Sequence, residues 1–236
     1  MLRALLILPF LLAAVPARAV ELIAHEVPPY VFDQDGIAYG PAIDIARELV
    51  SAVGIHQDFR ILPSLRFIRD LEDGGRIGIM KARTRDTEDR FQWIAPLATE
   101  AAGFAALAPR PAPETLTEAQ TMGIIGVMEG GFAEPWLDHR QVAFDATRDE
   151  ATNLQKLLAK RIDVWLAPLS AMGVLTGRGG KPSLRSQINV GPPVFQVEYY
   201  IVASRDVPAA IVEGMQRRHR ALIAEGTFQA LMHPTR

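Results

Sequence analysis

Two stretches near the amino-terminus decide the fold: Glu21-Leu-Ile-Ala-His-Glu-Val-Pro-Pro-Tyr30 and Gly40-Pro-Ala-Ile-Asp-Ile-Ala-Arg-Glu-Leu-Val50. Residues Glu21–Val27 predict a short strand. Pro28-Pro29 ends it, because proline has a fixed φ angle and no backbone N–H to donate to a sheet. From Pro41 to Val53 apolar residues recur at helical spacing, and proline is favoured in a first helical turn. The sequence therefore begins with a predicted strand and a predicted amphipathic helix.

The same alternation continues toward the centre of the chain. His56–Leu62 is a second predicted strand, Leu65–Leu71 a helix that ends at Gly74-Gly75, and Ile77–Met80 a third strand. This β-α-β-α-β order predicts a mainly parallel sheet with helices packed on it.

The pattern then restarts, which indicates a second α/β lobe. Its predicted elements are a helix over 153–160 and strands over 101–108, 123–128, 162–166 and 194–203. Closing helices over 208–232, interrupted at Gly226, have no strand after them, so we expect them to return to the first lobe. Lobe 1 is then formed by residues 20–101 and 204–236, and lobe 2, with the crossing segments, by residues 102–203.

Residues 1–19 have the features of a secretory signal peptide. Arg3 gives a positive start, Leu5–Val15 is almost entirely apolar, and Ala17-Arg-Ala19 fits a small-x-small cleavage site. The apolar run is shorter than the roughly 20 residues that span a bilayer. We therefore predict cleavage after Ala19 and a periplasmic protein; the alternative is a segment that stays uncleaved as a membrane anchor.

The composition excludes several classes of function. The chain has 25 Lys and Arg against 27 Asp and Glu, without a dense basic run, which argues against a nucleic-acid partner. It has no Cys, so disulfides and thiolate metal sites are excluded, and its five His form no H-x-x-x-H pair. We expect neither a metal nor another cofactor.

Several segments resemble, in the same order, those of the family 3 extracytoplasmic solute-binding proteins, the polar amino-acid receptors of ABC transporters. The matching segments are Pro28–Tyr30, Gly40–Leu49, Arg83–Arg85, Glu88–Pro96, Gly126–Gly131, Asn153–Asp163 and Glu225–Phe228. The resemblance implies a periplasmic binding protein-like fold of type II, in which two α/β lobes joined by two crossing segments close on a small solute. It also implies a monomer whose partner is a membrane permease.

Within this resemblance, Arg90 matches the arginine that holds the ligand α-carboxylate. The planar guanidinium suits that task because it binds a carboxylate through two hydrogen bonds. Arg66 and Arg83 lie in or beside other matching segments and are further ligand-binding candidates. The alternative for Arg90 is a solvated side chain in a charged segment.

The loop Gly130-Gly131-Phe132 occupies the place where the family offers backbone and hydroxyl donors to the ligand. Glycines let a backbone approach a ligand closely, and free N–H groups favour an anion; a plain tight turn is the alternative. Phe132 departs from the hydroxyl residues of the family, which predicts an apolar or stacking contact. Tyr30 follows a strand end, where it forms either a cleft wall or a packed, half-buried ring.

A larger departure follows Arg161-Ile-Asp163. Amino-acid-binding members usually carry an Asp five residues beyond that final Asp, and it pairs with the ligand α-ammonium. Pro168 stands in this region, and it has neither a charge nor an N–H. Glu198, on the predicted second crossing segment, is either a replacement anion or an exposed strand residue.

These observations predict a periplasmic solute-binding protein. It would capture a small, polar, carboxylate-bearing solute, an amino acid or a related organic acid, for an ABC importer. Two alternatives are open: the ligand-binding component of a sensor, and an enzyme on the same scaffold, similar to the cyclohexadienyl dehydratases. The candidate acid–base groups are His25, Glu26, Glu129 and Glu198. None belongs to a distinctive catalytic motif, which favours binding over catalysis.

Overall fold

The computed structural model describes residues 20–178 and 184–233, so the predicted signal peptide lies outside the described residues. The first elements are β1 (Glu21–Ala24), β2 (Phe32–Gln34), β3 (Ile37–Tyr39), α1 (Pro41–Ser51), β4 (Arg60–Ile61), α2 (Ser64–Glu72), β5 (Arg76–Arg83) and β6 (Gln92–Leu107). They are followed by α3 (Leu116–Met122), β7 (Ile125–Met128), α4 (Ala133–Asp138), β8 (Phe144–Thr147), α5 (Glu150–Leu158) and β9 (Val164–Pro168). The last elements are α6 (Leu169–Gly173), η1 (Val174–Arg178), β10 (Ile188–Ala203), α7 (Ala209–Ala224) and α8 (Thr227–Met232).

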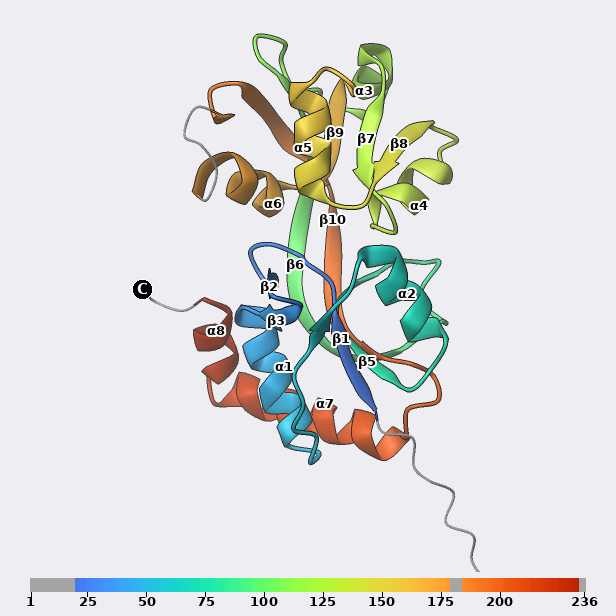
Figure 1. The fold of residues 1–236 in the computed structure, drawn as a ribbon, viewed down its shortest axis with the longest axis vertical. Helices are drawn as coiled ribbons and strands as arrows, with labels where there is room; N and C mark the ends of the chain where they lie inside the picture. The colour runs from blue at the N-terminus through green and yellow to red at the C-terminus, as the bar shows by residue number, and fades with distance from the viewer. Residues whose placement is uncertain (1–19, 179–183, 234–236) are drawn as a thin grey trace, which may run out of the picture.

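The described strands form one sheet in the order β2-β3-β4-β1-β5-β10-β6-β9-β7-β8. At one end β1 pairs in parallel with β4 and β5, and at the other β7 pairs in parallel with β8 and β9. The long strands β6 and β10 pair antiparallel to each other and pass from one lobe to the other (Figure 1). The α/β alternation predicted from the sequence is thus present in both halves of the sheet.

The two long strands change neighbours along their length. Glu198–Ala203 of β10 pairs with β5 in the first lobe, whereas Ala102–Ala105 of β6 pairs with β9 in the second. Pro96 lies in the part of β6 that pairs only with β10, and Pro192 and Pro193 lie in the part of β10 that pairs only with β6. Proline is tolerated at such an edge because its missing N–H removes no ladder hydrogen bond there. This explains why β6 and β10 begin earlier than the sequence predicts.

Two other elements differ from the prediction. Only Arg60–Ile61 of the predicted strand 56–62 pairs, because residues 56–58 are exposed and polar side chains dominate there. Conversely, residues 32–39, which no predicted element covers, form the hairpin β2–β3; its turn has positive φ at Asp35 and Gly36, and the Gly36 amide donates to Asp33 Oδ1 at 2.8 Å. Asx turns of this kind stabilise tight hairpin connections.

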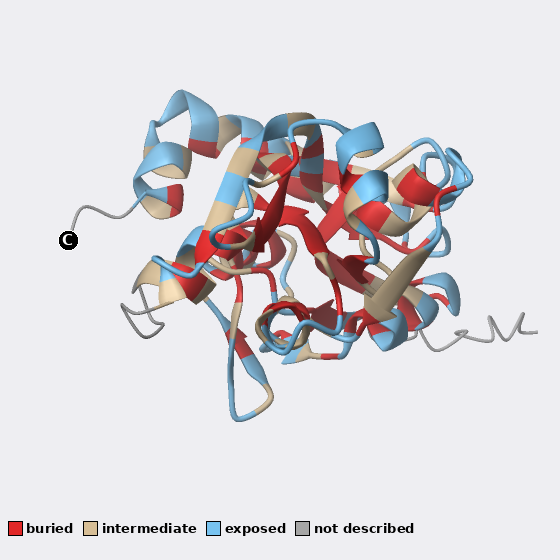
Figure 2. Cartoon of the chain, turned by 90° about the horizontal axis from the view of Figure 1, so that it is seen from above, coloured by how far each residue is buried: buried red, intermediate tan, exposed pale blue. Residues whose placement is uncertain are grey.

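The sheet of the first lobe is covered on both faces. Tyr199, Ile201 and Ala203 of β10 belong to the buried cluster that includes α1, whereas Tyr200 and Val202 pack with the α2 side chains. Successive strand residues point to opposite faces, so α1 and α2 lie on opposite sides of the sheet. The closing helices α7 and α8 pack on α1 (Figure 1). Buried residues concentrate in the strands and on the inward sides of the helices (Figure 2).

Candidate ligand cleft between the two lobes

A cavity lies where loops of the two lobes meet over the long strand β10. The first lobe contributes Val27 and Pro28, which follow β1, and the second contributes Gly131, Phe132 and the β9 end residue Pro168. The carboxyl ends of parallel strands are the usual ligand-binding edge of an open α/β sheet. The cavity therefore lies at the expected edge of both lobes at once.

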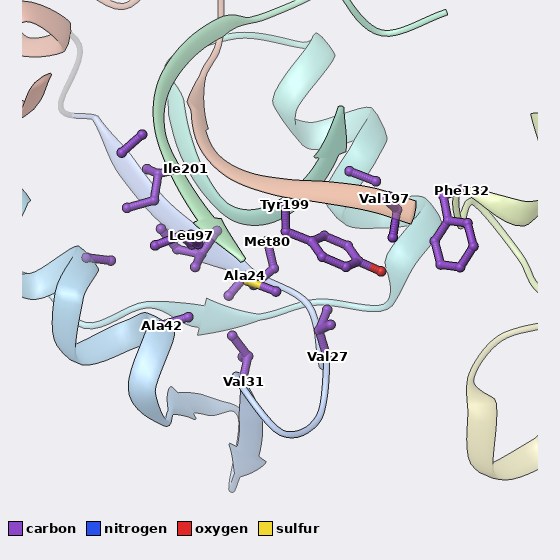
Figure 3. Close-up of a cluster of buried hydrophobic side chains, with 14 of the residues drawn as sticks. Ala24, Val27, Val31, Ala42, Met80, Leu97, Phe132, Val197, Tyr199 and Ile201 are labelled. Atoms are coloured by element: carbon purple, nitrogen blue, oxygen red, sulfur yellow. The ribbon is translucent and has the colours of Figure 1, made fainter. Parts of the chain in front are cut away.

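A side chain of the long strand β10 forms the base of this cavity. Tyr199 of β10 lines it and is only 4% exposed. Figure 3 shows its ring extending from β10 in the direction of Phe132. Beside it, the Tyr30 hydroxyl donates a hydrogen bond to the buried carboxylate of Glu100 on β6. Burial and the neighbouring acids Glu150 and Glu100 raise the pKa of Tyr199, so its hydroxyl stays protonated.

Two carboxylates line the cavity. Glu150, in the first turn of α5, accepts hydrogen bonds from Trp165 Nε1 at 2.7 Å and Asn153 Nδ2 at 3.3 Å. Burial raises the pKa of Glu150 to about 7, against the lowering effect of these two hydrogen bonds. Glu26 lies at the more exposed side, where burial and the charges of Asp33 and Asp149 raise its pKa. The cavity is thus acidic, with apolar walls.

The cavity adjoins a larger hollow between the lobes, which in turn adjoins a second one. One is lined by His25, Leu62 and Ser64 from the first lobe and by Asp149 and Thr152 from the second. The other is lined by Arg66 and Arg69 of α2, facing Glu129 and Arg148. Across this gap, a side chain at Gly130 would place its Cβ 2.8 Å from Ile68 Cδ1, so the two lobes are in close contact there.

Comparison of the whole fold with solved structures decides the architecture. The chain superimposes on a histidine kinase sensor domain similar to periplasmic binding proteins, with a TM-score of 0.77, 16% identity and coverage of 91% of this chain and 95% of that one. The glutamate-bound GluR0 ligand-binding core from Nostoc punctiforme superimposes with a TM-score of 0.75 and 16% identity, over 90% of this chain and 96% of that one. The arginine-bound ABC transporter substrate-binding protein AbpA from Streptococcus pneumoniae superimposes with a TM-score of 0.73 and 12% identity, over 93% of this chain and 95% of that one. The fold is that of the two-lobed periplasmic binding proteins.

This confirms the predicted fold class. At sequence identities of 12–16%, the three neighbours establish the fold alone. No protein-family model matches the chain, and no curated protein matches it significantly. The periplasmic binding fold supplies the frame in which each predicted site residue can be placed.

The structure places Tyr30, Gly131 and Phe132 in or beside the cavity. Tyr30 is half-buried and bonded to Glu100, while Gly131 and Phe132 line the cavity from the second lobe. The neighbouring Gly130 has a φ of +68°, a conformation that favours glycine, and its amide donates to Glu134 Oε2 at 2.7 Å. Phe132 packs edge-on against Phe195 of β10, in keeping with its apolar character.

Arg83 and Glu198 lie around β10 on the other side from Tyr199. Glu198 and Tyr200 point to the face opposite Tyr199, and the Tyr200 hydroxyl donates to Glu198 Oε2 at 3.4 Å. The Arg83 guanidinium lies about 5 Å from the ring centres of both Tyr200 and Trp93, which contact each other edge to face, and its Nε donates to Glu88 at 2.8 Å. Arg83 lines a separate hollow on this side, where His139 of the second lobe lies 3.2 Å from Asp86 of the first.

Arg90 is turned away from the cavity. Its guanidinium pairs with Glu72 at the end of α2, with about half of the side chain exposed. The preceding segment coils back through hydrogen bonds between Thr84 and Thr87, and the Arg90 amide binds the Thr87 carbonyl at 3.1 Å. None of the cavity-lining residues is Arg90. The carboxylate-binding role of Arg90 therefore stays a prediction from sequence.

The sequence reasoning missed Glu150, Tyr199 and Glu100. The predicted helix began at Asn153, whereas α5 begins at Glu150 with Asp149 as its cap, the Asp149 carboxylate accepting from the Thr152 amide at 2.6 Å. Aspartate is a favoured N-cap residue, so this signal was present in the sequence. Pro168 does line the cavity, as expected from its position.

Of the candidate acid–base groups, His25 is buried beside β5. His25 binds the Met80 carbonyl at 3.0 Å through Nε2, and its burial lowers its pKa to about 4. Within residues 20–178 and 184–233, no group of three or more acidic, His or Cys side chains is arranged to hold a metal ion. In the same ranges no helix is long and apolar enough to cross a membrane.

Proposed function

We propose that this protein is a periplasmic solute receptor that captures a small polar solute in the cavity between its lobes and delivers it to the permease of an ABC importer. The observation that carries the proposal is a cavity lined by both lobes and by Tyr199 of β10, which together with β6 connects them. The predicted signal peptide and the transporter substrate-binding protein among the structural neighbours support the location and the partner.

Closure of the lobes would couple capture to delivery. A solute that touches Val27 in one lobe and Phe132 in the other binds the closed arrangement better than an open one, so it shifts the population toward closure. The central parts of β6 and β10 are the natural hinge, because a few residues in connecting segments absorb such a change.

A second candidate, the ligand-binding component of a sensor, is favoured by the sensor domain among the structural neighbours. Both candidates need the same cavity and differ in the membrane protein that the closed form contacts. Cross-linking of the solute-loaded protein in the cell envelope, followed by identification of the partner as a permease or a kinase, separates the two.

The experiment that tests solute capture is a thermal-shift screen over amino acids, organic acids and amines, followed by small-angle scattering with each hit. A solute at 100 times its Kd adds about 2.7 kcal/mol to the free energy of unfolding. We expect a hit to lower the radius of gyration. A tight ligand that leaves the radius unchanged, with no open form detected in its absence, would contradict closure. The same screen tests the predicted carboxylate preference.

A further inference from the structure

The cavity holds negative charge that no basic side chain neutralises. In the described part of the chain, Glu26, Glu100 and Glu150 take part in no ion pair; their side-chain partners there are neutral donors such as Tyr30 and Trp165. Arg148, at the neighbouring hollow, is mostly exposed and pairs with Asp149 at 3.0 Å. A carboxylate removed from water without a cation is costly, so a cationic partner from outside would be favoured.

The Tyr199 hydroxyl is a second and independent sign of a missing partner. The side chain is 96% buried, yet within residues 20–178 and 184–233 its hydroxyl has no hydrogen bond. It belongs to the cavity lining and is close enough to Glu100 and Glu150 for their charges to act on it. Because Tyr199 lines the cavity, its hydroxyl is free to donate to a carboxylate while accepting from a ligand N–H.

The walls specify the rest of the ligand. Val27, Pro28, Pro168 and Ala171 give the cavity apolar walls, and Phe132 presents an aromatic ring. The larger adjoining hollow, which shares Glu26, Pro28 and Glu150 with the cavity, provides the room for an aliphatic stem. Aromatic rings attract cations through their negative faces, more strongly when water is excluded. An anionic group at the same place would face like charges, which costs several kcal/mol.

We propose that the cavity selects a solute with an ammonium or guanidinium group on a short aliphatic stem, held by Glu150, Glu26 and the Tyr199 hydroxyl. This inference rests on the proposed solute-binding function and deepens it by naming the ligand class. A carboxylate on the ligand is not required, because neither Arg83 nor Arg90 lines the cavity.

A matched set of three probes tests the proposal by calorimetry on the mature protein. Arginine carries the guanidinium and an α-amino acid group, agmatine keeps the guanidinium without the carboxylate, and citrulline keeps the amino acid group with a neutral side chain. We expect agmatine to bind at least as tightly as arginine. Citrulline should bind at least about tenfold more weakly, because its side chain is neutral and its one remaining cation, the α-ammonium, is held beside its own carboxylate.

Three variants locate the effect. Glu150→Gln, which keeps the shape and removes the charge, should weaken agmatine binding at least about tenfold, and Tyr199→Phe should weaken it several-fold. Glu213→Gln on α7 is the control, because it removes the same charge from an exposed residue that does not line the cavity. Circular dichroism checks that each variant folds.

The outcomes separate this inference from the proposed function. Binding of citrulline or glutamate with lobe closure, but not of agmatine, would overturn the cationic ligand and leave solute capture intact. Agmatine binding that Glu150→Gln and Tyr199→Phe do not alter would place the cation elsewhere and overturn the assignment. Absence of binding by every compound in the screen and by all three probes would overturn both proposals.

Discussion

The hydroxyl of Tyr30 donates a hydrogen bond to the carboxylate of Glu100, and this bond ties the loop after β1 to a strand that passes between the lobes. Glu100 is buried and has no cationic partner in the described structure, so Tyr30 provides its charge-stabilising contact. Hydrogen bonds to an ionised group contribute more than those between neutral groups. The first prediction follows from this contact.

Tyr30→Phe should lower the free energy of unfolding by about 1–3 kcal/mol near neutral pH, because Glu100 loses its donor while staying buried. Urea unfolding measures the change. Tyr39→Phe is the matched control, since Tyr39 is exposed and stacks on Phe32 through its ring. The double variant Tyr30→Phe/Glu100→Gln should recover much of the loss; equal stability of Tyr30→Phe and the parent would show that the bond contributes nothing.

Affinity for a guanidinium ligand should depend on pH through Glu150. Its pKa is about 7 without ligand, so lowering the pH from 8 to 5 protonates the carboxyl and removes the charge that attracts the cation. The groups facing it are Glu26, Asp149, Glu100 and Tyr199. Agmatine suits the measurement because a guanidinium stays protonated throughout this range.

Calorimetric titrations at several pH values should show weaker binding as the pH falls. In Glu150→Gln this dependence should be strongly reduced, because the amide does not titrate. An equally steep dependence in the variant would assign the titration to Glu26 or another group.

Glu150→Gln should also stabilise the ligand-free protein at alkaline pH. A carboxyl pKa raised by folding means that stability falls as the pH rises from the unfolded value of 4.5 through the folded value of about 7. Glutamine avoids this loss, so at pH 8 the free energy of unfolding of the variant should exceed that of the parent by about 1–3 kcal/mol, which thermal unfolding detects as a higher melting temperature. At pH 4 the two proteins should unfold at nearly the same temperature. A destabilised variant at pH 8 would show that the hydrogen bonds to Trp165 and Asn153 outweigh the burial of charge.

Arg90→Ala should have little effect on the folded protein. The Arg90–Glu72 pair is about half exposed, and such pairs contribute less than about 1 kcal/mol. Because Arg90 is absent from the cavity lining, we expect ligand affinity to change by less than about twofold. A loss of most of the affinity for a carboxylate ligand would instead support the role that the sequence resemblance implies.

The contrast between Arg90 and Phe132 shows where sequence reasoning works for this site. Phe132 follows a buried strand that the local pattern identifies, and the end of such a strand is a predictable edge. Arg90 follows a segment without periodicity, and its direction depends on turns closed by Thr84 and Thr87. Because the chain reverses at these turns, the Arg90 side chain lies beside Glu72 at the end of α2 and not in the cavity.

What the sequence by itself determined is the order of strands and helices, the two-lobe division and the strand ends that border the cavity, because these depend on local hydrophobic periodicity and on prolines and glycines that stop elements. Only the tertiary structure decided which charges share the cavity. Glu26, Glu150 and Tyr199, which line it, come from three separate parts of the chain, and Glu100 on β6 lies near enough for its charge to act on Tyr199. Their approach depends on the pairing of β6 with β10 and on the contact of the lobes. Electrostatic interactions act over distances in space rather than along the chain, so the acidity of this cavity is a property of the folded molecule.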